Sequence, residues 1–282
     1  MARKALLAGI DDYAPLGPGG PDLRGCVNDV RDMAHTLNAL GVVPASPGSM
    51  RILTDGAATR ANIMKGLAWL VAKAQPKDTL IFYYSGHGSQ VADLDGDDLD
   101  GRDETICPHD FATAGMIRDD DLRKAFSALP ANANLDVFLD SCHSGTGTRD
   151  LLPVDETGNA VTIRYVEPPL DVGFFIESNP HLPARRLLRG RGEERQVVIV
   201  PGLNHALWAG CRDNQTSAEA VVNGVVRGIF TYSYCRALRR AGLGITRRRL
   251  DALVSADVKA LGYGQVPQLE GTAKTIVEPV FT

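Results

Sequence analysis

The fold is decided by two stretches, TLIFYYSGHG at residues 79–88 and LDVFLDSCHSG at residues 135–145. Each begins with a nearly continuous apolar run, which is typical of a strand buried on both faces of a sheet. Each ends in a turn that carries a reactive side chain, His87 in the first and Cys142 in the second. Ligands of open α/β sheets bind beyond the carboxyl ends of the strands. If the two strands are parallel neighbours, an imidazole and a thiol share one crevice.

Strands and helices alternate along most of the remaining chain. Short apolar runs predict further strands at Ala5–Ile10, Met50–Leu53 and His205–Cys211. Apolar residues at helical spacing, together with capping residues and glycine or proline stops, predict helices at about 26–41, 59–74, 119–129, 227–241 and 246–261. This alternation predicts an α/β protein, a three-layer α/β/α sandwich with a mostly parallel central sheet of about six strands.

Composition excludes several classes of protein. The 282 residues are 44% hydrophobic and 23% charged, so a core can form without a disulfide or metal staple. The net charge of −4 excludes a polybasic nucleic-acid binder. No apolar run approaches the ~18 residues of a membrane span, and the first apolar run is too short for a signal peptide. Five widely spaced cysteines without a CxxC pair suggest reduced thiols. We therefore expect a cytoplasmic protein with no membrane or nucleic-acid partner.

The thiol and the imidazole each have an ordinary structural interpretation. A cysteine after a strand is usually a small buried apolar residue, and a histidine in a glycine turn is usually structural. A thiol becomes nucleophilic at neutral pH when a base or cation lies beside it, and an imidazole meets that need. The occurrence of Cys142 and His87 at two successive strand ends therefore favours a catalytic pair.

The motifs around these two residues resemble those of a known family. YSGHG at 84–88 and DSCHSG at 140–145 are similar to the catalytic motifs of caspase-like peptidases, and specifically of metacaspases, including the prokaryotic type. The His-to-Cys spacing agrees with the ~50 residues typical of caspases. Further similar motifs extend over most of the chain: GCVNDV at 25–30, DNQTSA at 213–218, GIFTY at 228–232 and PQL at 267–269. The resemblance implies a single caspase-like peptidase domain over residues 1–282.

The resemblance also implies an activity, a cysteine endopeptidase that cuts after Arg or Lys. Cys142 would be the nucleophile and His87 the general acid and base. The backbone N–H groups of Cys142 and Gly88 would stabilise the oxyanion. The implied partners are protein or peptide substrates with Arg or Lys at the cleavage site, and the implied state is a monomer.

Carboxylates are expected to form the pocket for the basic substrate side chain, the S1 pocket. Asp140 lies two residues before Cys142 and, by alternation, on the same face of its strand. Asp29 matches the family's aspartate in GCVNDV; its ordinary alternative is an early-helix acid that favours the helix dipole. Cys26 would lie at the rim and Ser85 beside His87. Two desolvated carboxylates bind one guanidinium strongly.

An acidic segment at residues 93–104 contains seven acids and one arginine. It is not an EF-hand, because Asp98 stands at the position that requires glycine. Metacaspases commonly need calcium, so the resemblance implies an activating Ca²⁺ site. The matching positions are Asp103, Asp119, Asp120 and Asp150. The alternative is a solvated acidic face beside a capped helix.

The segment at about 146–196 lacks periodicity and is rich in proline. A connection of this length is usually functional or flexible. Its end is rich in arginine, and Arg185, Arg186 and Arg189 are candidate sites at which the enzyme cuts itself. The alternative is a solvated surface loop.

Two other classes of function are considered. A catalytically silent binding or scaffold protein with the caspase fold is the main alternative, although Cys142 and His87 are both present. A serine hydrolase is disfavoured because the sequence has no G-x-S-x-G motif. The arginines at 236–249 are interpreted as solvated helix faces rather than a nucleic-acid surface.

Overall fold

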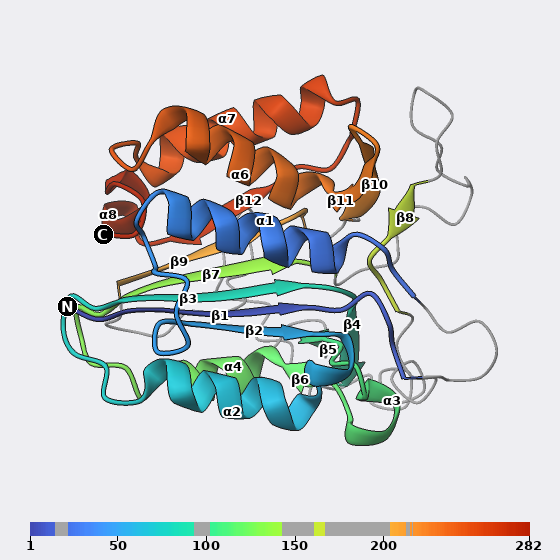
Figure 1. Ribbon diagram of the computed structural model, residues 1–282, viewed down its shortest axis with the longest axis horizontal. Helices are drawn as coiled ribbons and strands as arrows, with labels where there is room; N and C mark the ends of the chain where they lie inside the picture. The colour runs from blue at the N-terminus through green and yellow to red at the C-terminus, as the bar shows by residue number, and fades with distance from the viewer. Residues whose placement is uncertain (15–21, 93–101, 143–160, 167–203, 213–214, 216) are drawn as a thin grey trace, which may run out of the picture.

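The central sheet of the computed structural model has six strands in the order β12-β9-β7-β3-β1-β2 (Figure 1). The structure describes residues 1–14, 22–92, 102–142, 161–166, 204–212, 215 and 217–282. Five strands run parallel, and the edge strand β12 pairs antiparallel with β9. Their bounds are β1 Arg3–Gly9, β2 Met50–Thr54, β3 Thr79–Ser85, β7 Asn134–Asp140, β9 Asn204–Ala209 and β12 Gln268–Gly271. The predicted mostly parallel sheet of about six strands is confirmed.

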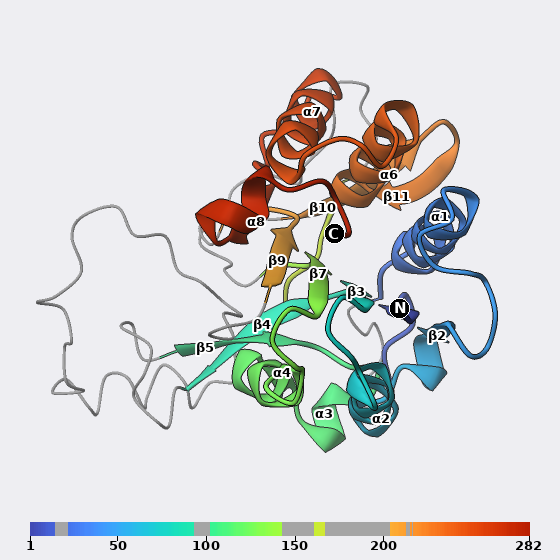
Figure 2. The same cartoon turned by 90° about the vertical axis from the view of Figure 1, so that its left-hand side faces the viewer.

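Helices cover both faces of this sheet (Figures 1 and 2). One face carries α1 (Cys26–Ala39), α6 (Ile229–Ala241) and α7 (Arg247–Ala260), and the other carries α2 (Arg60–Val71) and α4 (Asp119–Phe126). Alternating residues of each strand feed the two cores. On β3, Ile81 and Tyr83 belong to the core under α1 and α6, whereas Phe82 and Tyr84 belong to the core under α2 and α4. Because both faces are buried, the strands are apolar throughout, as the sequence predicts.

Several short elements are absent from the sequence-based prediction. A small antiparallel sheet contains β4 (Gly88–Ala92), β5 (Arg102–Ile106) and β6 (Ile117–Arg118). A second contains β8 (Thr162–Ile163), β10 (Ala218–Val222) and β11 (Val225–Gly228). The short helices α3 (Phe111–Ala114) and α8 (Ala273–Val277) and the 3₁₀ helix η1 (Asp55–Ala57) complete the described elements. These strands have two to five residues, too few for a clear period-2 pattern, and β8 lies within the segment predicted to lack regular structure.

The interpretation of the late arginines as solvated is wrong for Arg247. Its guanidinium is fully buried and forms two hydrogen bonds to Asp136 of β7, Nε to Oδ1 and Nη2 to Oδ2, both 3.1 Å. The Trp208 indole also donates to Asp136 at 3.4 Å. This bidentate pair ties the first turn of α7 to the middle of the sheet. A buried carboxylate requires such a partner, since an isolated buried charge is costly.

Removing one member of this pair should destabilise the fold. We expect Arg247→Met, in a Cys142→Ala background that would exclude the self-cleavage expected from the sequence, to lower the free energy of unfolding by about 3–5 kcal/mol, because Asp136 is left buried without its guanidinium. Urea denaturation followed by circular dichroism measures the change. Lys274→Ala is the matched control: its pair with Glu278 is 80% exposed at the lysine, and the expected change is within about 0.5 kcal/mol. A loss below about 1 kcal/mol in Arg247→Met would contradict the assignment.

Candidate active site

The register of two neighbouring strands brings His87 and Cys142 to the same edge of the sheet. Ser85, the last residue of β3, pairs with Asp140, the last residue of β7. His87 and Cys142 each follow two residues later in the chain. The Gly86 N–H still donates to the Asp140 carbonyl at 3.3 Å, so the two chains remain side by side as they leave the sheet. Both reactive residues are buried beyond the carboxyl ends of parallel strands.

The backbone of His87 is held on both sides. Its N–H donates to the Tyr13 hydroxyl at 2.7 Å, and its carbonyl accepts from the Cys107 N–H at 3.0 Å. The Tyr84 hydroxyl lies 2.7 Å from the same carbonyl oxygen. The imidazole lies beside the Tyr13 ring, with 5.0 Å between centroids. A Cβ at Gly86 would lie 2.7 Å from the Tyr13 hydroxyl, so this turn requires glycine. The backbone of His87 is therefore held in place, and its ring packs against Tyr13.

The thiol of Cys142 contacts residue 217, which precedes β10. Its Sγ lies 3.3 Å from the Ser217 carbonyl oxygen, and the Ser217 N–H is close to the same sulfur. The Ser217 hydroxyl donates to Asp140 at 2.6 Å. Ser217 thus links the thiol to the strand end that carries it.

Two backbone N–H groups converge on a single oxygen. The Gly88 N–H and the Cys142 N–H both donate to the carbonyl oxygen of Arg164, each at 3.1 Å. These are the two donors assigned from sequence to the oxyanion. The distances lie in the range at which paired donors stabilise negative charge on a carbonyl oxygen.

The side chain of Arg164 is fully buried in an acidic pocket. Its Nη2 lies 2.7 Å from Asp29 and 3.4 Å from Glu219, and its Nη1 lies 3.0 Å from Asp140. Nη1 also donates to the Ser85 hydroxyl at 2.8 Å. The residues predicted for the S1 pocket therefore surround one guanidinium. Cys26, buried at the first turn of α1, also lies near this charge.

The pocket holds more negative than positive charge. Burial alone would lower the pKa of Arg164, but the attraction of Asp140 and the other acids raises it well above its ordinary value. Burial raises the pKa of Asp29 to about 7; Arg164 opposes this rise and Asp140 reinforces it. Asp29 is therefore harder to ionise in this pocket than in water, even with a cation beside it.

Helix N-termini offset part of the surplus charge. The Thr231 N–H, in the first turn of α6, donates to Asp140 at 3.2 Å. The Gly228 N–H, just before α6, donates to Asp29 at 2.9 Å. Ahead of α1, the Gly25 N–H donates to Glu219 at 3.0 Å. Free N–H groups at a helix N-terminus carry partial positive charge, so both helices stabilise the acids of the pocket.

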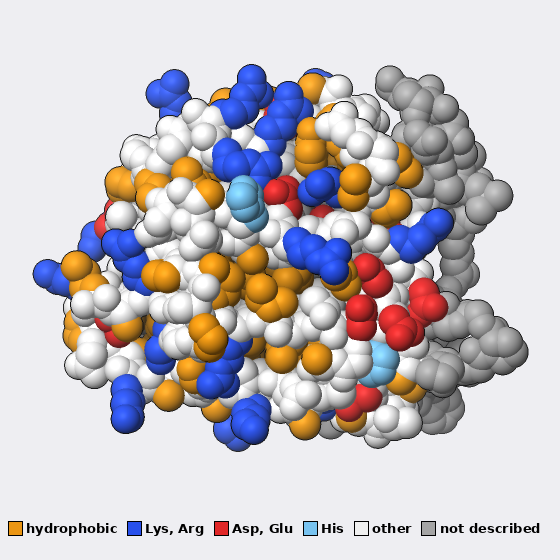
Figure 3. Space-filling view, in the orientation of Figure 1, with side chains coloured by type: hydrophobic (Ala, Val, Ile, Leu, Met, Phe, Trp, Pro, Cys, Tyr) orange, Lys and Arg blue, Asp and Glu red, His pale blue; other side chains and the backbone are white. Residues whose placement is uncertain are grey.

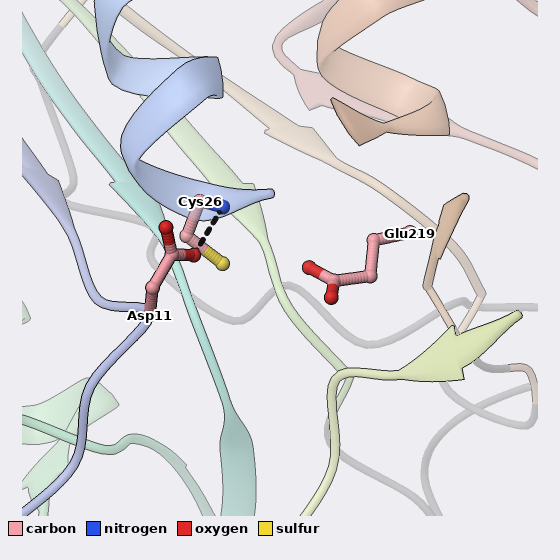
Figure 4. A group of neighbouring side chains, drawn as sticks. All are labelled: Asp11, Cys26 and Glu219. Atoms are coloured by element: carbon pink, nitrogen blue, oxygen red, sulfur yellow. Dashed lines mark hydrogen bonds between the residues drawn. The ribbon is translucent and has the colours of Figure 1, made fainter. Parts of the chain in front are cut away.

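Glu219 also belongs to a group with Asp11 and Cys26, whose possible ligand atoms lie within 4.8 Å of one another (Figure 4). This group has the donor types of a metal site, but its contacts explain it otherwise. Asp11 accepts from the Cys26 N–H at 2.7 Å and from the Val27 N–H at 3.3 Å, which caps α1. Burial raises the pKa of the Cys26 thiol well above its ordinary value, so the thiol is uncharged where it lines the pocket. We interpret the group as a helix cap and pocket wall.

The residues expected to bind calcium lie at a different place, where β5 meets α4. Asp103 and Asp119 are 1% and 5% exposed, and Asp120 is the second residue of α4. Each carboxylate forms an ion pair with an arginine: Asp103 with Arg118 at 3.3 Å, and Asp119 and Asp120 with Arg123 at 3.0 and 2.6 Å. Carboxylate oxygens are the ligands that Ca²⁺ takes, so the donor chemistry fits this ion.

Four predicted residues lie outside the part of the chain that the structure describes. They are Asp150, expected at the calcium site, and the self-cleavage candidates Arg185, Arg186 and Arg189.

Three residues of the site are missed by the sequence analysis: Arg164, Ser217 and Glu219. Ser217 lies within, and Glu219 directly after, the DNQTSA motif at 213–218, so that resemblance marked their neighbourhood without a role. Arg164 lies in VTIRYV at 161–166, a short apolar and β-branched run inside the proline-rich segment. This run is the one local signal that would have marked a strand around Arg164.

The surface near the pocket is also acidic. Asp12 and Asp22 are exposed after β1, and Asp55 follows β2. In Figure 3, acidic side chains gather at the end of the sheet where the parallel strands finish. A concentration of one sign of charge beside a site attracts ligands of the opposite sign.

Among the described residues, no helix has the length and apolar character needed to cross a membrane.

Comparison with known proteins identifies relatives over most of the chain. Residues 3–151 match the family model "Metacaspase, peptidase C14 domain". The chain is 35% identical over 294 residues to metacaspase-1 of Coccidioides immitis, covering 95% of this chain and 61% of that protein. It is 34% identical over 292 residues to metacaspase-1A of Aspergillus terreus, covering 95% of this chain and 70% of that protein.

Two solved structures share the fold. A protein from Geobacter sulfurreducens superposes with a TM-score of 0.68 and 24% identity, covering 100% of this chain and 99% of that one. Caspase-1 from Spodoptera frugiperda gives a TM-score of 0.54 and 12% identity, covering 95% of this chain and 85% of that one. The fold is therefore caspase-like, as expected. With the family model and the metacaspase relatives, these findings confirm the resemblance: the chain belongs to the metacaspase family of caspase-like cysteine peptidases.

Proposed function

We propose that this chain is a cysteine endopeptidase that cuts peptide bonds after Arg or Lys, is stimulated by calcium and can cut itself. The observation that carries the specificity is the burial of the Arg164 guanidinium among Asp29, Asp140 and Glu219. A substrate arginine would make the same contacts. A lysine would enter as a point charge and could not contact the carboxylates from two separate nitrogens, so arginine is preferred.

The proposed chemistry uses the two residues at the strand ends. The Cys142 thiolate attacks the carbonyl carbon, and the N–H groups of Gly88 and Cys142 stabilise the oxyanion. His87 then donates a proton to the leaving amine, which leaves a thioester on Cys142. Water, deprotonated by His87, hydrolyses the thioester and restores the thiol. The position of the Arg164 carbonyl, 3.1 Å from both N–H donors, supports this arrangement.

A peptide library varied at the residue before the cleavage site tests this function. We expect hydrolysis after Arg, slower hydrolysis after Lys, and a kcat/KM lower by on the order of 10⁴ for Asp, because an acidic side chain leaves the pocket carboxylates unpaired. The Cys142→Ala variant should be inactive. Preference for Asp would refute the pocket assignment. Absence of turnover with every peptide, together with tight peptide capture, would instead favour a catalytically silent binding protein.

Two glycine-to-alanine variants, one in the pocket and one away from it, test whether the space beside Gly228 binds the substrate arginine. A Cβ at Gly228 would lie 2.6 Å from both Arg164 Nη1 and Asp29 Oδ2, so Gly228→Ala occupies the space of the guanidinium. We expect it to raise KM for arginyl peptides at least about 10-fold. Gly244→Ala, with no atom within 4 Å of the added Cβ, should leave KM unchanged. Equal KM values in the two variants would contradict the assignment.

The surplus acid in the pocket predicts that binding an arginine releases protons. Arg164 lowers the pKa of Asp29 toward about 7, so the pKa is higher when the pocket lacks a cation. A cation that enters near pH 7 therefore expels part of a proton, and the affinity for an arginyl peptide should rise with pH by up to about tenfold per unit.

Calorimetry of an arginyl peptide binding to the Cys142→Ala, Arg164→Gln double variant, in two buffers of different ionisation enthalpy, measures this release. Adding Asp29→Asn should reduce it. Proton uptake, or release that persists undiminished in the Asn variant, would contradict the role of Asp29.

Calcium binding is proposed at Asp103, Asp119 and Asp120, where two buried carboxylates and the half-buried Asp120 meet at the first turn of α4. The ion would replace the arginines as the partner of these acids. We expect calorimetry to detect Ca²⁺ binding to the Cys142→Ala protein and expect Asp119→Asn to weaken it at least about 10-fold. Asp257→Asn, which alters an acid on α7 paired with Arg236, is the control and should not change the affinity. Equal affinities in the two variants would refute this location.

A further inference from the structure

Residues 162–166 lie in the site as an extended peptide. Thr162 and Ile163, which form β8, pair antiparallel with Glu219 and Ala218 of β10. The Arg164 N–H donates to the Ser217 carbonyl at 3.1 Å, and beyond it the Val166 N–H donates to the Gly88 carbonyl at 2.9 Å. An extended segment bound by main-chain hydrogen bonds to a sheet edge is a common mode of peptide recognition.

Three separate contacts place Arg164 where the residue before a cleaved bond would lie. Its carbonyl oxygen accepts from both donors assigned to the oxyanion. Its guanidinium fills the acidic pocket. Its N–H is bound by Ser217, the residue that also contacts the Cys142 thiol. Main chain, side chain and carbonyl are thus all positioned at once, which is the pre-orientation that accelerates an intramolecular reaction.

We propose that the Arg164–Tyr165 peptide bond is the bond that the chain cuts in itself, and that before this cut Arg164 blocks the S1 pocket as an intramolecular inhibitor. The proposal rests on the proposed cysteine endopeptidase activity. To that activity it adds the identity of the bond that is cut and the way in which the uncut chain is inhibited. It also differs from the sequence-based candidates Arg185, Arg186 and Arg189, which lie at least 21 residues farther along the chain.

The reaction balances without any co-reactant other than water. The Cys142 sulfur bonds to the Arg164 carbonyl carbon, and the bond from that carbon to the Tyr165 nitrogen breaks. His87 supplies the proton that makes Tyr165 a free amino terminus. Water then cleaves the thioester, which leaves Arg164 with a carboxylate and restores the Cys142 thiol.

Inhibition before the cut follows from proximity. A tethered residue competes for the pocket at an effective concentration on the order of millimolar, so an external arginine must displace it. All of the guanidinium's contacts with Asp29, Asp140, Glu219 and Ser85 would have to be exchanged for those of the substrate. Cutting frees the two chain ends, and Arg164 can then leave the pocket.

A time course of the purified full-length chain, analysed by intact-mass spectrometry, tests the cut. We expect two fragments, residues 1–164 and 165–282, formed at a rate that does not depend on protein concentration. Cys142→Ala should stay intact, Arg164→Lys should be cut more slowly, and Arg164→Gln should not be cut at this bond. Fragments that begin at Arg186, Leu187 or Gly190, with the 164–165 bond intact, would overturn the proposal.

The inhibitory role is tested by binding to proteins that cannot be cut. An arginyl peptide should bind the Cys142→Ala, Arg164→Gln protein at least about 10-fold more tightly than the Cys142→Ala protein, whose pocket is filled. Equal affinities would overturn the inhibition. A thermal melt of each variant checks the fold, and Cys142→Ala, Arg164→Lys provides a second comparison in which the pocket keeps a cation.

The outcomes also separate this inference from the proposed function. Turnover of arginyl peptides with an intact Arg164–Tyr165 bond would refute the self-cleavage site alone. Failure of both wild type and Arg164→Gln to cut any basic peptide, with or without calcium, would refute the endopeptidase itself.

Discussion

The burial of three carboxylates around one point is the constraint on which the site depends. Asp29 comes from α1, Asp140 from the end of β7 and Glu219 from β10. Taking such charges out of water costs several kcal/mol each unless partners compensate. Backbone N–H groups at the starts of α1 and α6, the Arg164 guanidinium, and the hydroxyls of Ser85, Ser217 and Thr231 together supply the compensation. The pocket therefore favours a cation. Because the acids outnumber the bases, the free energy of the folded protein is higher when the pocket is empty than when a cation fills it.

The strand register couples this pocket to the nucleophile. Asp140 and Cys142 are two residues apart, and Ser85 and His87 stand in the same relation on the neighbouring strand. The first residue of each pair contacts the guanidinium and the second is the reactive one. Ser217 links the acidic pocket to the reactive thiol, because its hydroxyl donates to Asp140 and its backbone contacts the Cys142 sulfur. A basic side chain held in the pocket thus places its own carbonyl at the two N–H donors.

The sequence could predict what its local motifs encode. The strand ends identify His87 and Cys142, and the apolar runs yield the parallel sheet and its helices. Arg164 and Glu219 could not be assigned, because their roles arise from pairing between β8 and β10, which are short and far apart in the chain. The burial of Arg247 could not be predicted for a related reason. Its partner Asp136 is a single acid inside an apolar strand, and only the packed structure brings the two residues together. Long-range pairing of charges leaves no periodic signal.

The small antiparallel sheet of β4, β5 and β6 would connect the proposed calcium site to His87 and Gly88. β5 carries Asp103 and pairs with β4, whose first residue is Gly88, one of the two proposed oxyanion donors. Directly after β5, the Cys107 N–H holds the His87 carbonyl at 3.0 Å. A cation that fixes Asp103 against α4 would stiffen β5, and both contacts are carried by that strand and its end. The proposed ion would therefore act on the geometry of the dyad and the oxyanion donors without touching substrate. In our proposal Arg164 would control access to the pocket, so two events, ion binding and removal of a residue, would govern one site.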